Sequence, residues 1–196
     1  MIAIEVSSVR YGFVQHLLLT LGDKLKPEIA EAANRAAAGV RTDGKRLIAQ
    51  QYPPLSQSEV ADAVTLVRAH KGDDDPTAQS IFKGPRLPLY KFSPRPSSIM
   101  GGKTSGGVTA LVSGKNVQFR HAFIANLGYG PQVFQRKPGG ERFELYKMMV
   151  NAIPQMVEDN PHGGRIPKAM ASGAEERFMK RFEQQVDRLL KEQGFE

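Results

Sequence analysis

The chain has 196 residues, a formal net charge of +7, and neither cysteine nor tryptophan. A chain of this length suffices for one domain with a hydrophobic core, and the lack of cysteine excludes a disulfide framework, a thiolate metal site and a thiol nucleophile. Because no apolar run approaches membrane-spanning length and the first residues lack the pattern of a secretion signal, we expect an unexported protein with no membrane partner.

A long helix is predicted over Leu25–Tyr52. Pro27 suits a first turn, the acidic side chains of Glu28 and Glu31 complement the positive end of the helix dipole, and Pro53 ends the pattern. Apolar residues recur at helical spacing, namely Leu25, Ile29, Ala33, Ala36, Val40, Leu47 and Ile48. Since the stripe contains the small side chains of Ala33 and Ala36, another helix can approach closely there. We expect the seam of Ala33, Ala36 and Val40 to pack inside the fold or against another subunit.

The pattern then predicts one short helix followed by strands. Ser56 to Glu59 resembles a capping box that opens a helix through Val64. An exposed turn is expected at Asp73–Pro76, and a hairpin turn at Ser113–Asn116. The β-prone runs between turn residues are Thr65–Ala69, Ile81–Lys83, Leu87–Phe92, Val108–Val112, Val117–Phe119, Ala122–Leu127 and Gln132–Arg136.

Positive charge is concentrated in the middle of the chain. From Pro76 to Gly140 there is no acidic residue, and the basic residues are Lys83, Arg86, Lys91, Arg95, Lys103, Lys115, Arg120, Arg136 and Lys137. Such a segment favours a polyanion or an acidic protein surface, although basic residues also simply solubilise strands. The candidate residues for an electrostatic contact are Lys115, Arg120, Arg136 and Lys137. Four aromatic residues interleave with the basic ones, namely Tyr90, Phe92, Phe119 and Phe134. Aromatic residues at strand spacing more often belong to the core than form platforms on which bases stack.

A Gly-Lys-Thr sequence around Lys103 resembles part of a phosphate-binding loop. The spacing fails, because Ser97 stands where the first glycine is required. The context fails as well, since prolines precede the loop and a strand pattern follows it. We therefore expect a basic loop between two strands rather than a nucleotide site.

The last third of the sequence returns to a helical pattern. Phe143–Val157 is apolar and interrupted by Pro154, and Ser172 to Glu175 offers a second capping box. The helix that follows carries an apolar face that needs a partner surface, formed by Phe178, Phe182, Val186 and Leu189, and Gly194 ends it. The order helix, strands, helix predicts an α+β fold with an antiparallel sheet.

No active site emerges from the residue pattern. The four histidines, His16, His70, His121 and His162, are dispersed and show no metal-ligand spacing. No serine lies in a nucleophile-elbow motif. We expect no catalytic residue, no metal and no cofactor.

Several segments resemble one family, the prophage minor tail protein Z family of tail completion proteins in lambda-like long-tailed phages. They are the alanine-rich helix around Ala32–Ala37, then Ala122–Leu127, Gln132–Lys137, and Phe143–Tyr146 running on to Asn151–Met156. The resemblance covers most of the chain in order. The loop Pro94–Gly107 follows no pattern of the family, and the family has no catalytic residues to transfer.

The resemblance implies a single tail-completion domain over residues 1–196, mainly helical at 1–64, basic and β-rich at 65–140, and mainly helical at 141–196. It also implies a structural virion protein, made in the bacterial cytoplasm, at the head-proximal end of the tail. Its partners would be copies of itself in a ring, six-fold like the tail tube, adjoining tail terminator, tube or neck proteins, and phage DNA as a candidate contact. The competing interpretation is a nucleic-acid-binding module with no virion role.

Overall fold

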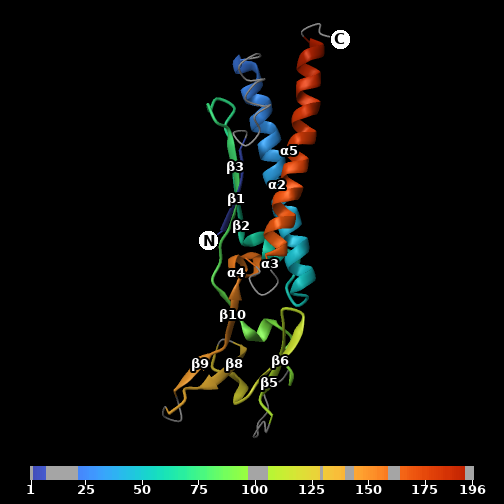
Figure 1. Cartoon of the computed structure of the whole chain (residues 1–196). Helices are drawn as coiled ribbons and strands as arrows, with labels where there is room; N and C mark the ends of the chain where they lie inside the picture. Colours follow the sequence, from blue (N-terminus) through green and yellow to red (C-terminus); the bar gives the residue numbers. More distant parts are fainter. Residues whose placement is uncertain are drawn as a thin grey trace.

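A computed structural model describes residues 2–7, 22–96, 106–128, 130–139, 144–158 and 164–192. The molecule is elongated, with a helical body at one end and a smaller β-rich part at the other (Figure 1). We call residues 2–7, 22–82, 153–158 and 164–192 the body, and residues 89–96, 106–128, 130–139 and 144–148 the distal lobe. The expected α+β class with antiparallel sheets is confirmed.

The body contains a three-stranded antiparallel sheet in the order β1-β3-β2. Its strands are β1 (Ile2–Ser7), β2 (Val64–Val67) and β3 (Thr77–Phe82). Along β3 every second residue is buried, as expected for a sheet with one face on a core. The buried Ser80 hydroxyl donates a hydrogen bond to the carbonyl of Ala37 at 2.7 Å, which fixes the sheet against the long helix.

That helix, α2 (Lys26–Gln51), follows the 3-10 turn η2 (Gly22–Leu25) and confirms the prediction, with Pro27 in its first turn. The capping box before α3 (Gln57–Asp62) is also confirmed, because the Ser56 side chain and the Glu59 carboxylate each accept the other's backbone N–H. The short helix ends at Asp62 rather than at Val64, since Val64 already pairs with β3.

The second long helix, α5 (Arg165–Glu192), runs beside α2 in the opposite direction (Figure 1). Phe178, Phe182 and Val186 are buried on the expected face, the two phenyl rings stack at 5.9 Å, and Leu189 packs at its edge. The predicted start at Ser172 is wrong, because the helix begins at Arg165. Gly173 lets α5 pass close to α2, because a Cβ at this position would lie only 3.0 Å from the Asp43 carboxylate of α2. The predicted end at Gly194 lies outside the described residues.

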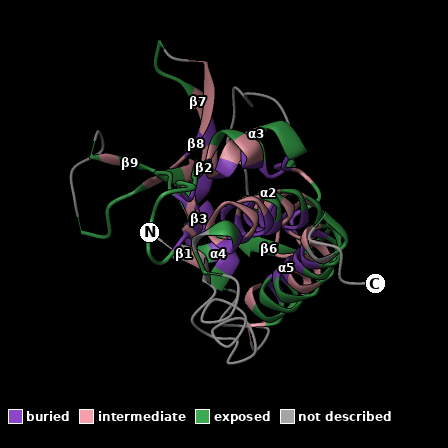
Figure 2. Ribbon diagram, turned by 90° about the horizontal axis from the view of Figure 1, so that it is seen from above, coloured by how far each residue is buried: buried purple, intermediate pink, exposed green. Residues whose placement is uncertain are grey.

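The alanine seam is internal. Ala33, Ala36 and Val40 have no exposed surface, and α2 lies between the sheet and α5 when the molecule is viewed along its axis (Figure 2). The apolar face of α5 is also buried inside the chain. Of the two expected positions for the seam, inside the fold or against another subunit, the structure shows the first. The seam residues and Phe178, Phe182 and Val186, which the sequence offered as candidate subunit contacts, form core within one chain, and Leu189 packs at the edge of that core.

The distal lobe consists of short strands that the sequence largely located. They are β5 (Val108–Val112), β6 (Lys115–Phe119), β7 (Ala122–Asn126), β8 (Pro131–Arg136) and β9 (Leu145–Lys147). β5 and β6 form a hairpin whose turn residues, Ser113 and Gly114, have φ of 52° and 73°, and β7, β8 and β9 form an antiparallel sheet. The predicted strand Leu87–Phe92 is only partly correct, because it divides into β4 (Arg86–Pro88) and the 3-10 turn η3 (Leu89–Lys91).

The helix predicted over Phe143–Val157 is wrong for most of its length. Its first part forms β9 and β10 (Met149–Ala152), and only α4 (Ile153–Glu158) is helical. β9 pairs with β8, and β10 pairs with β4. These non-local backbone hydrogen bonds override a local apolar pattern that fits either structure.

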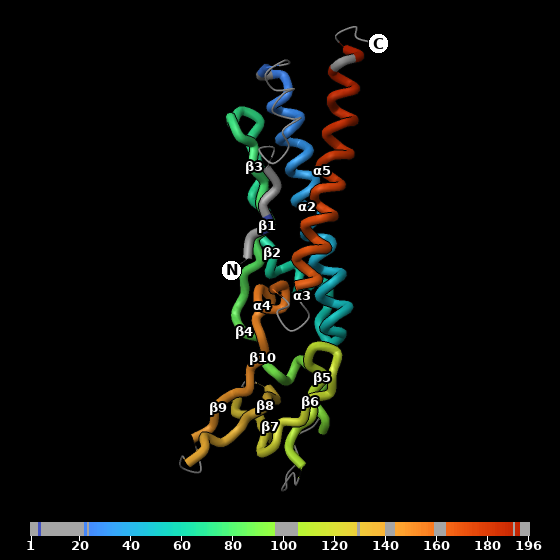
Figure 3. The backbone as a smooth tube through the Cα atoms, viewed as in Figure 1, coloured from blue at the N-terminus to red at the C-terminus, as the bar shows by residue number. Residues whose placement is uncertain are grey.

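The distal lobe is an insertion in the body. The chain enters it through β4 and returns through β10, and these two strands pair side by side, with Pro88 opposite Met149 (Figure 3). The body is thus assembled from the N-terminal and C-terminal parts of the chain, and the central part forms the lobe.

Candidate electrostatic interface of the distal lobe

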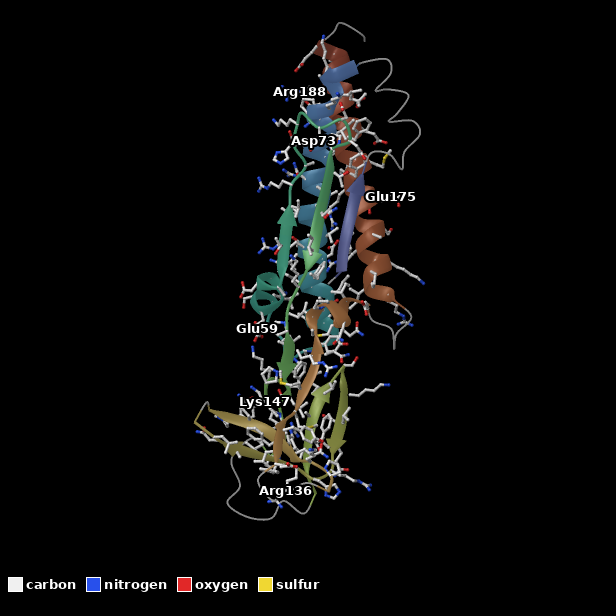
Figure 4. The ribbon with its side chains drawn as sticks, turned by 90° about the vertical axis from the view of Figure 1, so that its left-hand side faces the viewer. Glu59, Asp73, Arg136, Lys147, Glu175 and Arg188 are labelled. Atoms are coloured by element: carbon white, nitrogen blue, oxygen red, sulfur yellow. The ribbon has the colours of Figure 1, made fainter. Side chains whose placement is uncertain are left out.

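The two parts of the molecule differ in charge. Acidic and basic residues are nearly equal in number in the body, whereas Glu144 is the single acidic residue among the described residues of the lobe. The basic residues of the lobe are Lys91, Arg95, Lys115, Arg120, Arg136, Lys137 and Lys147. In Figure 4, Arg136 and Lys147 lie at one end of the molecule, far from Asp73 and Arg188 at the other. The part of the acid-free window that lies in the lobe therefore gives this end of the molecule a net positive charge.

Two of these basic side chains have acidic partners. Lys91 of η3 pairs with Glu59 of α3, and this hydrogen bond lowers the pKa of the Glu59 carboxyl below its ordinary value of 4.5. Lys137 lies 3.6 Å from Glu144 across the open end of β8 and β9. Arg95, Lys115, Arg120 and Lys147 are exposed, and none of them forms an ion pair with a residue that the structure describes.

The four candidate residues from the sequence do not form one cluster. Lys115 begins β6 next to the hairpin turn that approaches the carbonyl of Gln51 at the end of α2, so it lies at the body side of the lobe. Arg120 follows the other end of the same strand, and at about 3.3 Å per residue the two lie well over 10 Å apart. Arg136 ends β8, and Lys137 follows it on the opposite side of the backbone.

One face of the β7-β8-β9 sheet combines positive charge with aromatic rings. Strand alternation and register place seven residues on it, and we call it the outer face: Phe123, Ala125, Gln132, Phe134, Arg136, Leu145 and Lys147. The inner face carries the buried side chains of Ala122, Ile124 and Val133 and belongs to the core. Every described charged residue of the outer face is basic, because the pair Lys137–Glu144 falls on the inner side.

The rings on the outer face are arranged in a row with one cation. Phe123 and Phe134 are directly opposite each other on neighbouring strands, with ring centroids 6.4 Å apart and planes inclined by 35°. The guanidinium carbon of Arg136 lies 5.8 Å from the centroid of Phe123, within cation–π range. Phe123 and Phe134 are half-buried, whereas Arg136 and Lys147 are exposed.

The sequence missed two members of this face. The sequence pattern places Lys147 in a helical segment outside the basic window and identifies Phe123 only as part of a strand. The signal that could have found both is period-two alternation across three consecutive strands. Of the four aromatic residues that interleave with basic ones, Phe92 is buried, Tyr90 and Phe119 pack against the core, and only Phe134 lies on the outer face.

Within residues 22–96, 106–128, 130–139, 144–158 and 164–192, together with β1, no group of metal-ligating side chains converges. None of the helices described here combines the length and apolar character that a bilayer crossing needs. Two of the histidines, His16 and His162, lie outside the described residues. The same holds for Ser97 and Lys103 of the glycine loop.

Comparisons with protein-family models, with curated proteins and with solved structures found no match for this chain in any of the three.

Proposed function

We propose that this protein is a structural minor tail protein of a bacteriophage or prophage, which completes the tail at the end that meets the head. The observation that carries the proposal is the concentration of net positive charge in one lobe of an elongated molecule whose body is nearly balanced in charge. It is supported by the ordered sequence resemblance to minor tail protein Z. Part of that resemblance falls on β7 and β8, which build the outer face.

The shape suggests how such a subunit would work. In a ring, the body would contact lateral neighbours, and each distal lobe would present its charge to an adjoining ring or to DNA in the tail. Individual exposed charge pairs contribute on the order of 0–1 kcal/mol, but cyclic symmetry repeats each contact around the ring. The alanine seam is internal, so the ring contacts would come from exposed surfaces of α5 and of the sheet.

The decisive test is genetic. We expect that deletion of the gene leaves tail tubes of normal length, abolishes infectious particles, and is rescued by the protein supplied in trans. Full infectivity of the deletion phage, or labelling of the protein at the distal tail tip, would contradict the proposal.

The role of the lobe is tested by charge reversal with a matched control. Lys115, Arg120, Arg136 and Lys137 are changed together to glutamate. The control makes the same change of net charge on exposed basic residues of the body, Arg68, Lys71, Lys168 and Lys180. We expect the lobe variant, but not the body variant, to fail in complementation while both retain the wild-type circular dichroism spectrum. Equal complementation by both variants would assign the charge to solubility.

A second candidate function is a nucleic-acid-binding module without a virion role, which the aromatic and basic outer face favours. The deletion experiment separates the two, because a module of this kind would leave assembled particles infectious.

A further inference from the structure

We propose that the outer face of the β7-β8-β9 sheet binds single-stranded nucleic acid, with a base stacked on Phe134 and phosphates held by Arg136 and Lys147. The inference deepens the proposed function, since it names the partner of the same lobe. It rests on that function only for its biological setting, because the binding itself is a property of the isolated protein.

The first argument is the geometry of the three side chains. Phe134 lies in the central strand, directly opposite Phe123 on one side and Lys147 on the other. Arg136 is two residues further along the same strand and therefore on the same face. Side chains in such directly opposite and diagonal positions are close enough to contact one ligand together. A ring, a guanidinium and an ammonium thus converge on one small surface.

The second argument is what covers each ring. The Arg136 guanidinium covers one side of Phe123, and the 35° inclination between the rings excludes a closed parallel stack. Phe134 is half-buried, so part of its side chain is exposed, and we place the base there. The guanidinium plane of Arg136 offers a second stacking surface, because arginine as well as aromatic side chains supports unpaired bases.

The third argument selects the kind of partner. An acidic protein segment would use the positive charge but would gain little from two aromatic rings between the charges. A duplex offers phosphates, but its base planes are already stacked inside. A single strand uses both features, because each nucleotide presents a phosphate and an unpaired planar base. The outer face, whose described charged residues are all basic, matches that combination.

The absence of tryptophan from the chain allows a direct measurement. The variant Phe134→Trp carries one indole on the outer face, and a base stacked on it should quench its fluorescence. The probe is an oligothymidylate of about 16 nucleotides, at the upper end of the site sizes typical of strand-binding sheets. We expect saturable quenching by this probe, and none by the same strand annealed to its oligodeoxyadenylate complement or by polyglutamate.

Matched substitutions in the full chain test the individual roles by fluorescence anisotropy of the labelled probe. Phe134→Leu should weaken binding about tenfold, and Phe134→Tyr should retain it, since loss of one stacked base costs about 1–3 kcal/mol. Arg136→Gln and Lys137→Gln remove the same charge from neighbouring positions on opposite faces. We expect Arg136→Gln to weaken binding several-fold more than Lys137→Gln, and Lys147→Gln to resemble Arg136→Gln.

Three results would overturn the inference: equal affinity for the single strand and the duplex, equal effects of Arg136→Gln and Lys137→Gln, or quenching by polyglutamate. Circular dichroism of each variant shows whether the fold is retained, and Phe134→Tyr remains informative if Phe134→Leu does not fold. Failure of these binding tests together with loss of infectivity in the deletion phage would reject this site while leaving the tail function in place. Binding of the single strand together with a fully infectious deletion phage would support this site and reject the tail function.

Discussion

The body and the distal lobe are stabilised in different ways, although one chain forms both. The body buries large side chains, among them Phe82, Phe178 and Phe182, between two long helices and a sheet. The lobe buries Leu89 and Phe92 at and after η3, and smaller side chains along its strands, such as Val108, Ala110 and Val133. It also carries like charges that repel one another. Because more of the large buried side chains lie in the body, we expect most of the free energy of folding to reside there, and we expect the lobe to tolerate the repulsion between its like charges.

The largest expected effect is in the core of the body. Phe182→Ala should lower the free energy of unfolding by about 3–5 kcal/mol, because it opens a cavity beside Phe178. Urea unfolding followed by circular dichroism measures this, with the exposed neighbour Glu183→Ala as control. An unchanged unfolding midpoint for Phe182→Ala would contradict the view that the α2–α5 interface dominates stability.

The corresponding test in the lobe is Gly107→Ala. Gly107 has φ of 77°, and an added Cβ would lie 2.2 Å from the carbonyl oxygen of Phe119, so the open end of the β5–β6 hairpin must separate. The positive φ alone costs an L-residue about 1–2 kcal/mol, and overpacking adds about 1–3 kcal/mol. We expect altered near-ultraviolet signals from lobe aromatics with unchanged helical ellipticity. Gly72→Ala, where nothing lies within 4 Å, is the control. A loss of helix in Gly107→Ala would show that the two parts fold as one unit.

The two partners of the ion pair between the long helices, Asp43 and Arg177, should contribute unequally to the free energy of unfolding. Asp43 is 6% exposed and accepts a hydrogen bond from Arg177 at 2.7 Å, a contact that raises the pKa of the guanidinium. Arg177→Leu leaves a buried carboxylate with only the longer contact to Arg46 at 3.4 Å, which should cost about 1–3 kcal/mol. Asp43→Asn should cost less, because Arg177 can turn toward water. Equal losses in urea unfolding at neutral pH would refute this asymmetry.

The smallest effect is expected at the junction of the two parts, where Glu59 of the body pairs with Lys91 of the lobe. The folded pKa of Glu59 is lowered, so the pair contributes above the unfolded value of about 4.5 and is lost as the pH falls through the folded value. Lys91→Ala should therefore destabilise by about 0–1 kcal/mol near neutral pH and not at all in strong acid. The control Lys83→Ala, at an exposed residue nearby, should show no such pH dependence. Identical profiles of stability against pH for the two variants would contradict a stabilising contact between Lys91 and Glu59.

The sequence predicted those parts of the fold that local signals determine. Proline and acidic residues located the start of α2, the Ser56–Glu59 box located α3, and turn residues bounded β5 and β8. It failed where a distant part of the chain decides. The capping-box pattern from Ser172 to Glu175 predicted a helix start but lies inside α5, where Gly173 makes room for the Asp43 side chain of α2.

The candidate site was predicted in the same partial way. Net charge in a window of sequence survives any fold, so the positive end could be expected before the structure was known. The outer face could not, because it depends on the pairing of β9 with β8, which places Lys147 beside Phe134. Of the four basic residues that the sequence named, Lys115 and Arg136 lie on separate sheets, a separation that the sequence does not reveal.

The paired strands β4 and β10 have an evolutionary consequence. Pro88 and Met149 face each other where the chain leaves and re-enters the body, and neighbouring strands are only about 4.8 Å apart. A segment that begins and ends at adjacent points can be lengthened, shortened or replaced without moving the scaffold that holds it. Residues 89–148 begin and end at such adjacent points, so a change of length within this stretch would alter the distal lobe while the packing of α5 against α2 is kept.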